Sequence, residues 1–275
     1  MLEKKKTNRT QFTGFLKKAE MKVRRVLADM ARHFFSKLGV DKIFKSDPRL
    51  FFHSDYYLCH NARRLEHLAS LRIPVAGLSV LEVGAGIGDH SHYFIDRGCT
   101  ITITDARPEN VSYLRKRYPR CKVCILDLEN PVKIEGAPFD IVYCYGLLYH
   151  LRNPEESLRF LARNTKKMLL LETCVSFGDR EEINLEDERQ WKPTQAYSGT
   201  GCRPTRVWLF KRLQRYFEHI YVPVTQPNHE EFPLDWTAPE RHSTKLSRAI
   251  FIGSRVEIEN DLLKPSLINK HIRHE

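Results

Sequence analysis

The stretch that decides the fold is Val80-Leu81-Glu82-Val83-Gly84-Ala85-Gly86-Ile87-Gly88-Asp89. Its first half is apolar and β-branched, which is typical of a short buried strand. The Gly-x-Gly-x-Gly triplet predicts a tight turn and then a helix over about residues 89–97, because glycine adopts φ > 0 and lets a ligand approach the backbone. A nicotinamide-binding fold would place its third glycine at position 89, which is aspartate here, so the pattern counts against a dinucleotide.

Three more strand-like runs follow, over residues 99–105, 121–128 and 139–146. The first ends at Asp105, where a carboxylate can accept both hydroxyls of a ribose. The second ends near Asp127, an acid suited to the amino group of an adenine. These two acids and the glycine triplet predict a site for a single adenosine-containing ligand.

These motifs, in this order, resemble those of the class I S-adenosylmethionine-dependent methyltransferases. The resemblance spans roughly residues 60–175 and rests on Glu82–Gly88, Asp105, Asp127 and the Phe139–Val142 strand. It implies S-adenosylmethionine as cofactor, with its methionine part over the glycines, its ribose on Asp105, and its adenine near Asp127 and the Leu128 backbone. The cofactor-binding residues implied by the resemblance are Glu82, Gly84, Ala85, Gly86, Gly88, Asp105, Ala106, Asp127, Leu128 and Tyr145.

Strands and helices alternate along the chain, which predicts a parallel sheet with right-handed crossovers. Helices are expected over about residues 60–71, 108–118, 153–164 and 206–217, and further strands over 167–173, 219–224 and 248–253. We therefore expect an α/β fold: a Rossmann-like, seven-stranded, mostly parallel sheet with helices on both faces. It would form a domain over residues 51–255, followed by a polar tail over 256–275.

Two long stretches, at about residues 174–204 and 226–246, carry few periodic signals, and such stretches in compact domains are often functional. We expect them to form substrate loops. The aromatic run Phe51–Tyr57 either closes one wall of the pocket or is a packed connector.

The N-terminal 50 residues form a basic, amphipathic extension. They hold 14 of the 45 lysines and arginines and 5 of the 34 acids, and so carry +9 of the net charge of +11. From Phe12 to Leu38 the apolar residues fall at helical spacing, with basic residues between them. This predicted helix is a lid or packed on the core, lies on an anionic membrane surface, or binds nucleic acid.

Composition limits the remaining classes. No apolar run approaches the roughly 20 residues that span a bilayer, and the charged start resembles no signal peptide. Seven scattered cysteines fit reduced thiols better than a disulfide framework. We therefore expect a cytoplasmic protein, peripheral at a membrane surface if the basic helix binds lipid, and no metal site.

The segment after the fourth strand indicates the chemistry. Cys144-Tyr145-Gly146-Leu147 differs from the Asn/Asp-Pro-Pro-aromatic tetrad of many enzymes that methylate nitrogen, which disfavours that chemistry. His150 is the candidate general base, since its pKa suits proton transfer near neutrality; its alternative is a packed, hydrogen-bonded histidine. Glu172, at the end of the fifth strand, is either a substrate contact or a solvated acid.

The function expected from these observations is methyl transfer to a small-molecule acceptor, an oxygen of a sugar, glycan or lipid-linked precursor. A competing hypothesis is tRNA modification, because Gly146–Pro154, the Leu171–Thr173 strand end and the Trp208-Leu209 pair also resemble tRNA wobble-uridine carboxymethyltransferases. RNA would then bind the basic N-terminus. A third hypothesis is a non-enzymatic cofactor-binding or interaction module.

Overall fold

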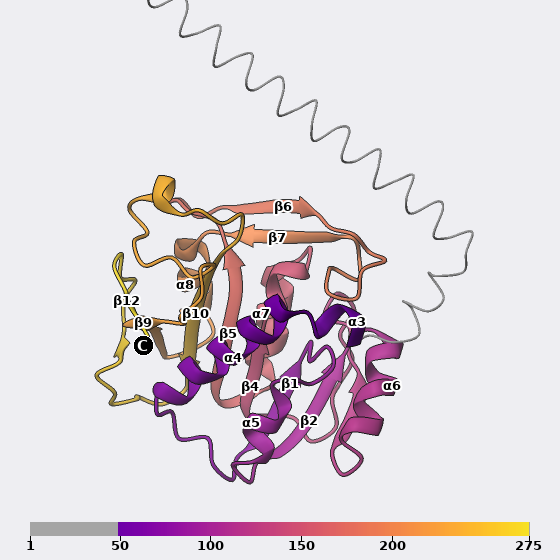
Figure 1. Cartoon of the computed structure of the whole chain (residues 1–275). Coiled ribbons are helices and arrows are strands. Elements are labelled where there is room, and N and C mark those ends of the chain that lie inside the picture. The colour runs from indigo at the N-terminus through magenta and orange to yellow at the C-terminus, as the bar shows by residue number, and fades with distance from the viewer. Residues whose placement is uncertain (1–48, 275) are drawn as a thin grey trace, which may run out of the picture. The chain divides into compact units, whose positions relative to one another are not determined.

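The computed structural model describes residues 49–274, which lie in one compact unit, Pro48–Glu275. An eight-stranded sheet forms its centre, in the order β11-β8-β10-β5-β4-β1-β2-β3 (Figure 1). The strands of this sheet are β1 (Ser79–Val83), β2 (Thr100–Asp105), β3 (Lys122–Ile125), β4 (Phe139–Tyr145), β5 (Thr165–Val175), β8 (His219–Pro223), β10 (Ser247–Ser254) and β11 (Leu263–Lys264).

Strands β1 to β5 are parallel, and β10 is inserted antiparallel between β5 and β8. The expected Rossmann-like, mostly parallel α/β fold is confirmed. The seven expected strands are present, and β11 adds an eighth by pairing with the edge of β8. Because the five parallel strands end at one edge, the segments that follow them converge there.

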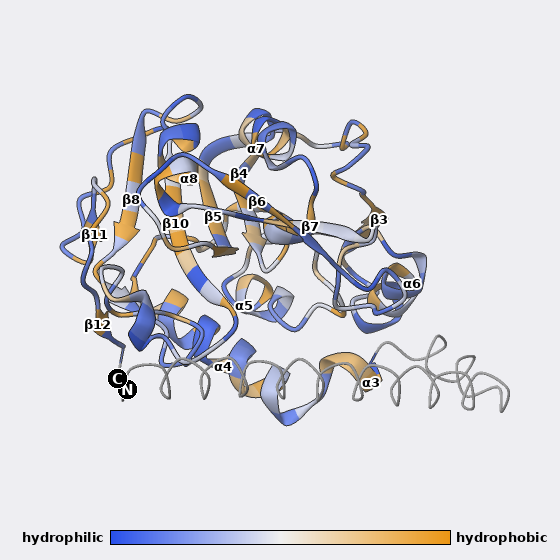
Figure 2. Ribbon diagram, turned by 90° about the horizontal axis from the view of Figure 1, so that it is seen from above, coloured by the Kyte–Doolittle hydropathy of each residue, from blue (hydrophilic) through white to orange (hydrophobic). Residues whose placement is uncertain are grey.

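Helices cover both faces of the sheet. They are α3 (Arg49–Phe52), α4 (Asp55–Ser70), α5 (Ser91–Ile95), α6 (Pro108–Arg117), α7 (Pro154–Arg163) and α8 (Arg206–Leu213), with 3₁₀ turns η1 (Leu148–His150) and η2 (Pro239–Arg241). Leu68, Phe94 and Leu114, from α4, α5 and α6, belong to one buried cluster. A second cluster contains residues of α7 and α8. Alternate strand residues join opposite clusters, as the two-residue period of a strand requires, and Figure 2 shows the hydrophobic residues concentrated in the central strands.

Helix α4 begins earlier than the expected residue 60. The Ser54 hydroxyl caps it by accepting a hydrogen bond from the Tyr57 N–H at 3.3 Å. The aromatic run is therefore partly helical, and Tyr56 and Tyr57 lie in the first turn of α4.

The stretch at 174–204 differs from the loop that we expected. After β5 the chain forms a hairpin of β6 (Ile183–Asp187) and β7 (Thr200–Pro204), which lies across the carboxyl edge of the sheet (Figure 1). Every residue of β6 is exposed. Its apolar residues are only Ile183 and Leu185, an alternation too short to indicate a strand from the sequence alone.

The C-terminal segment is also more ordered than the peripheral tail expected over 256–275. Besides β11, it supplies β12 (Ile272–Arg273), which pairs with β9 (Thr225–Gln226). Leu263 and His271 are buried. This segment therefore packs on the domain.

A buried ionic network joins α4 to β5 and β10. Glu172 of β5 has no exposed surface, and its carboxylate lies 2.9 Å from Arg248 Nη1 and 3.2 Å from Arg64 Nη2. Arg248 also donates from Nε to Glu231 at 2.6 Å. Glu172 is thus neither the substrate contact nor the solvated acid considered above.

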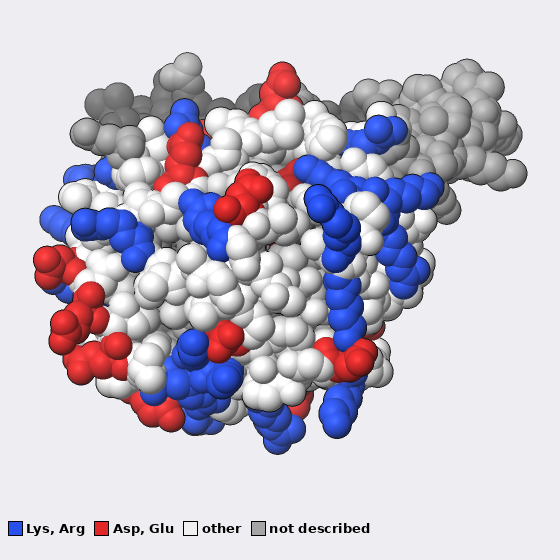
Figure 3. Space-filling view, turned by 90° about the horizontal axis from the view of Figure 1, so that it is seen from below, with Lys and Arg blue, Asp and Glu red and all other residues white. Residues whose placement is uncertain are grey.

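The predicted basic helix lies outside the described residues. Within residues 49–274, no helix is long and apolar enough to cross a bilayer. On the face of the body seen from below, acidic side chains lie among the basic ones (Figure 3).

The packing around Gly88 predicts a stability difference between two glycines. Gly88 has φ +79°, and an added Cβ would lie 2.6 Å from Tyr118 and 2.7 Å from Leu114, whereas Gly98, at φ +72°, has open space around it. Both alanine variants strain the backbone, but only Gly88→Ala also overpacks the contact with α6. We expect urea denaturation to show Gly88→Ala losing about 1–3 kcal/mol more than Gly98→Ala; equal losses would contradict this packing.

The ionic network predicts a second stability effect. Glu172→Gln leaves two buried guanidinium groups without this counter-charge, so the free energy of unfolding should fall by about 3 kcal/mol. The control is Glu135→Gln, which removes an exposed pair with Lys122 and should leave the denaturation midpoint unchanged. If both variants behaved alike, the network would not stabilise the fold.

Candidate active site

Two connected cavities lie at the carboxyl edge of the sheet. The larger is about 890 Å³ and the smaller about 90 Å³. They share lining residues from α3, α4, the glycine loop, η1 and the β6–β7 loop: Phe52, Tyr57, Gly84, Gly86, Gly146, His150, Thr194 and Gln195. The glycine loop and His150 therefore lie where the two cavities meet.

The glycine loop has the conformation that its sequence predicts. Gly84, Gly86 and Gly88 all have positive φ, which L side chains rarely adopt. Gly84 and Gly86 line both cavities, and Ala85 lines the larger one, whereas Gly88 lines neither. Gly88 instead packs against α6, and its carbonyl accepts a hydrogen bond from the Tyr118 hydroxyl at 2.6 Å.

Glu82 joins the glycine loop to α5. The Ser91 hydroxyl donates to its buried carboxylate, and burial raises the pKa of Glu82 to about 7. Glu82 also lines the larger cavity. It is therefore placed both to fix the turn and to face a ligand.

Asp105 ends β2 beside this loop. Its carboxylate accepts hydrogen bonds from the backbone N–H of Gly86 at 2.8 Å and of Arg107 at 2.9 Å, and from the Asn110 amide at 3.1 Å. Burial raises the pKa of Asp105, although these donors oppose the shift. A carboxylate has about four acceptor positions, so one remains for a ribose hydroxyl.

The other predicted cofactor residues are divided between the cavities. Ala106, Asp127 and Leu128 line the smaller cavity together with Asp105, and Tyr145 lines the larger one. The Tyr145 hydroxyl is buried and has no hydrogen-bond partner. The arrangement fits S-adenosylmethionine: a glycine-lined backbone between the cavities, two acids around the smaller one, and an unpaired hydroxyl in the larger. The individual contacts stay predictions.

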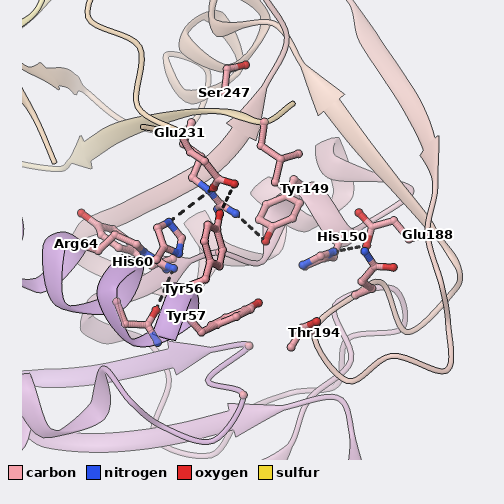
Figure 4. A pocket seen from close by; sticks show the side chains of 18 of the residues that line it. Tyr56, Tyr57, His60, Arg64, Tyr149, His150, Glu188, Thr194, Glu231 and Ser247 are labelled. Carbon is pink, nitrogen blue, oxygen red and sulfur yellow. Dashed lines mark hydrogen bonds and ion pairs between the residues drawn. The ribbon is translucent and has the colours of Figure 1, made fainter. Parts of the chain in front are cut away.

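His150 is paired with an acid that the sequence did not single out. Its Nδ1 is hydrogen-bonded to Glu188 (Figure 4), whose carboxylate also receives the Ala196 N–H at 2.7 Å and lies 3.3 Å from Arg203 Nη2. Burial lowers the pKa of His150, although Glu188 opposes the shift. Burial alone would raise the pKa of Glu188, but the bond with His150 brings it below its usual range. A neutral His150 that donates from Nδ1 keeps a lone pair on Nε2, so the pair can accept a proton there.

Arg107 fastens the β6–β7 loop over the smaller cavity. Its buried guanidinium donates to three carbonyls of that loop: Gln190 at 2.9 Å, Lys192 at 3.2 Å and Gln195 at 3.1 Å. It also lies 5.2 Å from the ring centre of Tyr197. The loop that supplies Glu188 is thereby connected to the end of β2.

Aromatic side chains form the wall opposite this loop. Phe52, Tyr56 and Tyr57 line the larger cavity, which favours the first of the two alternatives for the Phe51–Tyr57 run. Tyr149, behind His150, lies 4.9 Å from the Arg248 guanidinium. The large cavity is therefore both aromatic and charged.

Several lining residues had no signal in the sequence. His60, Glu188, Arg203, Glu231 and Arg248 all border the larger cavity. They come from α4, the β6–β7 hairpin, the loop after β9, and β10, and the last four fall in or beside the long aperiodic stretches. The length of those stretches was the one available indication.

Comparison with known proteins agrees with this geometry. Residues 80–168 match the family described as "Methyltransferase domain". The tRNA U34 carboxymethyltransferase of Photobacterium profundum is 28% identical over 160 residues, covering 54% of this chain and 47% of that protein. The same enzyme of Serratia proteamaculans is 28% identical over 158 residues, with the same shares. The chain thus spans about half the length of the curated relatives that it matches.

Solved structures share the fold at low identity. The N-terminal domain of EvdMO1, with S-adenosylhomocysteine (SAH) and D-fucose, aligns with TM-score 0.54 and 23% identity over 70% of this chain and 82% of that one. Magnesium protoporphyrin IX methyltransferase from Synechocystis PCC 6803, with bound S-adenosylmethionine, aligns with TM-score 0.51 and 15% identity over 83% and 96%. An S-adenosylmethionine-dependent methyltransferase from Mesorhizobium loti gives TM-score 0.52 and 15% identity over 72% and 100%. Residues 80–168 thus match a methyltransferase domain, and the described residues share the fold of solved S-adenosylmethionine-dependent methyltransferases.

Proposed function

We propose that the protein transfers a methyl group from S-adenosylmethionine to a hydroxyl oxygen of a small-molecule acceptor, a sugar, glycan or lipid-linked precursor. The observation that carries this proposal is the His150–Glu188 pair where the two cavities meet. A hydroxyl must lose a proton as it is methylated, and a neutral imidazole beside the cofactor end can accept it.

Different residues would bind the cofactor and the acceptor. Asp105, Asp127 and the glycine loop would hold S-adenosylmethionine, which supplies an already activated methyl group. His150 would accept the acceptor's proton on Nε2, while Glu188 fixes the ring and keeps Nδ1 protonated. The aromatic wall of Phe52, Tyr56 and Tyr57 would exclude water and position the acceptor, so that catalysis depends mainly on alignment.

A sugar acceptor has limited support from the comparisons. The structure of the EvdMO1 domain was determined in the presence of SAH and D-fucose, which is compatible with a sugar acceptor for this fold. Another neighbour of the same fold is a [4+2]-cyclase, SpnF, with TM-score 0.50. Fold alone therefore does not decide the reaction, and the His150 pair remains the main argument.

The second candidate is tRNA modification. It is favoured by the curated relatives, which are tRNA U34 carboxymethyltransferases. The basic residues Lys17, Lys18, Lys22, Arg24 and Arg25 would then contact phosphates, and binding would weaken steeply with salt. A cytoplasmic location and a membrane-surface role for the same segment also stay predictions.

The deciding experiment follows a radiolabelled methyl group from S-adenosylmethionine into a cell extract, separated into RNA, lipid with glycan, and small-metabolite fractions. We expect label in the lipid, glycan or metabolite fraction, and label in RNA would favour the second candidate.

Gly86→Val tests the cofactor site, because a Cβ at position 86 would lie 2.8 Å from Phe52 and the residue has φ +59°. This variant and Asp105→Ala should abolish cofactor binding in calorimetry, and unchanged binding in both would overturn the cofactor site.

The His150–Glu188 pair predicts a pH profile. The base form of His150 is needed, so kcat should fall with decreasing pH through the His150 pKa, which burial places below its ordinary value of 6.5. His150→Gln should lower kcat by about 10²–10⁴-fold without changing cofactor affinity. Glu188→Gln removes a group that raises the His150 pKa, so its acid limb should move to still lower pH as kcat falls.

The matched control is His92→Gln, which changes an exposed histidine on α5. It should leave both kcat and the acid limb in place. An unchanged profile in both His150→Gln and Glu188→Gln would exclude the pair from catalysis.

A further inference from the structure

A second group of polar side chains lies beside the larger cavity, on the side formed by α4, and two of its three members, His60 and Glu231, line that cavity. It consists of His60 on α4 and of His229 and Glu231 in the loop after β9. A ring nitrogen of each histidine and a carboxylate oxygen of Glu231 all lie within 4.8 Å of one another. Figure 4 shows His60 and Glu231 on the same wall as Tyr56. None of the three takes part in the chemistry proposed for His150.

His60 has an unmet bonding requirement at this place. The residue is 2% exposed, and its buried Nε2 has no hydrogen-bond partner. The nearest carboxylate oxygen, Glu231 Oε2, is 3.9 Å away, which is beyond hydrogen-bond distance. An unpaired buried nitrogen is costly, and a ligand between these two atoms would remove that cost.

Two other buried histidines show why this one differs. His67 and His271 also have one ring nitrogen without a partner, but the other nitrogen of each is hydrogen-bonded to a backbone carbonyl. Among the described residues, His60, His229 and Glu231 form the one group of three or more such side chains with metal-ligand spacing. The unpaired ring nitrogen of His60 thus belongs to the one group with metal-ligand spacing among the described residues.

Burial disfavours the charged form of both imidazoles. Burial, with the positive charges of Arg64 and Arg248, lowers the pKa of His60, and burial lowers the pKa of His229. The Nδ1 of His229 accepts a long hydrogen bond, 3.3 Å, from the Glu231 N–H, and a metal ion at that nitrogen would replace this bond. Two ring nitrogens and a carboxylate oxygen therefore lie close together, within 4.8 Å.

Glu231 supplies the negative charge of this group. Glu231 accepts hydrogen bonds from Arg248 at one oxygen and Tyr56 at the other, and each oxygen retains a second lone pair. Arg248 is in turn shared with Glu172. The formal charges of Arg64, Arg248, Glu172 and Glu231 sum to zero, so a divalent ion would have to compete with Arg248 for the Glu231 carboxylate.

We propose that His60, His229 and Glu231 bind a divalent transition-metal ion of the Zn²⁺ class. Two imidazoles and one carboxylate suit Zn²⁺ and its first-row neighbours, which bind at about 2.0–2.2 Å, whereas Mg²⁺ and Ca²⁺ prefer oxygen ligands. On such an ion the ligand atoms would be roughly 3.4 Å apart, so the group must contract slightly. Three protein ligands leave a coordination position for an oxygen of water or of an acceptor in the cavity. The acceptor-oxygen role rests on the proposed function, but metal binding does not.

The test uses the full chain, stripped with a chelator and then titrated with Zn²⁺ by calorimetry and with Co²⁺ by visible absorption. We expect one ion per chain, and at least about a tenfold loss of affinity in His60→Gln and in His229→Gln. His92→Gln and Cys59→Ser are the controls, since both positions are exposed and lie outside the group. These controls should bind as the wild type does.

His229→Gln is the decisive variant, because His229 is only half-buried and its replacement should leave the fold intact. Cofactor binding and the thermal melting curve, measured in the absence of metal, check this for each variant. Absence of stoichiometric Zn²⁺ binding by the wild type, or equal affinity in His229→Gln, would overturn the metal site. If the protein bound S-adenosylmethionine but no metal, the metal site would be refuted and the methyltransferase proposal would stand. If it bound the metal but no S-adenosylmethionine, the metal site would stand and the methyltransferase proposal would be refuted.

Discussion

The structure depends on a carboxylate with no contact with water. Glu172 lies in the middle of the sheet's most buried region, and two arginines from α4 and β10 provide its counter-charge. A buried ion pair gives little net stability, but losing one partner is costly. The network therefore acts mainly as a geometric constraint, because the buried charges are paired only when α4, β5 and β10 meet in one arrangement.

That arrangement also builds the acceptor side of the cavity. Arg248 extends from Glu172 to Glu231, and so fixes the loop after β9, while Arg64 brings α4 with Tyr57 and His60 to the same wall. On the opposite side, Arg107 does the same for the β6–β7 loop and thereby for Glu188. Three buried arginines, Arg64, Arg248 and Arg107, thus position the side chains on both sides of the cavity.

The convergence of the proposed cofactor residues was predictable because each of them is tied to a strand end that is local in sequence. Gly84, Gly86, Asp105 and Asp127 each follow a strand closely, and parallel strands end at one edge, so strand order alone brings them together. The acceptor half was not predictable in this way. His150 and Glu188 are 38 positions apart, and Arg248 and Glu172 are 76 apart. Their pairing depends on a hairpin whose outer strand is wholly exposed, and on an antiparallel strand inserted late in the chain.

The two halves of the site differ in how freely their side chains can be replaced. The cofactor half is built into the strand ends, and any change there disturbs the sheet. The proposed acceptor half consists of α4, the β6–β7 loop and the loop after β9, and a buried arginine ties each of them to the sheet. Their free faces can therefore change while the anchors stay in place. It follows that neighbours of the same fold can carry out different chemistry, and that the acceptor must be inferred from the side chains on these three segments.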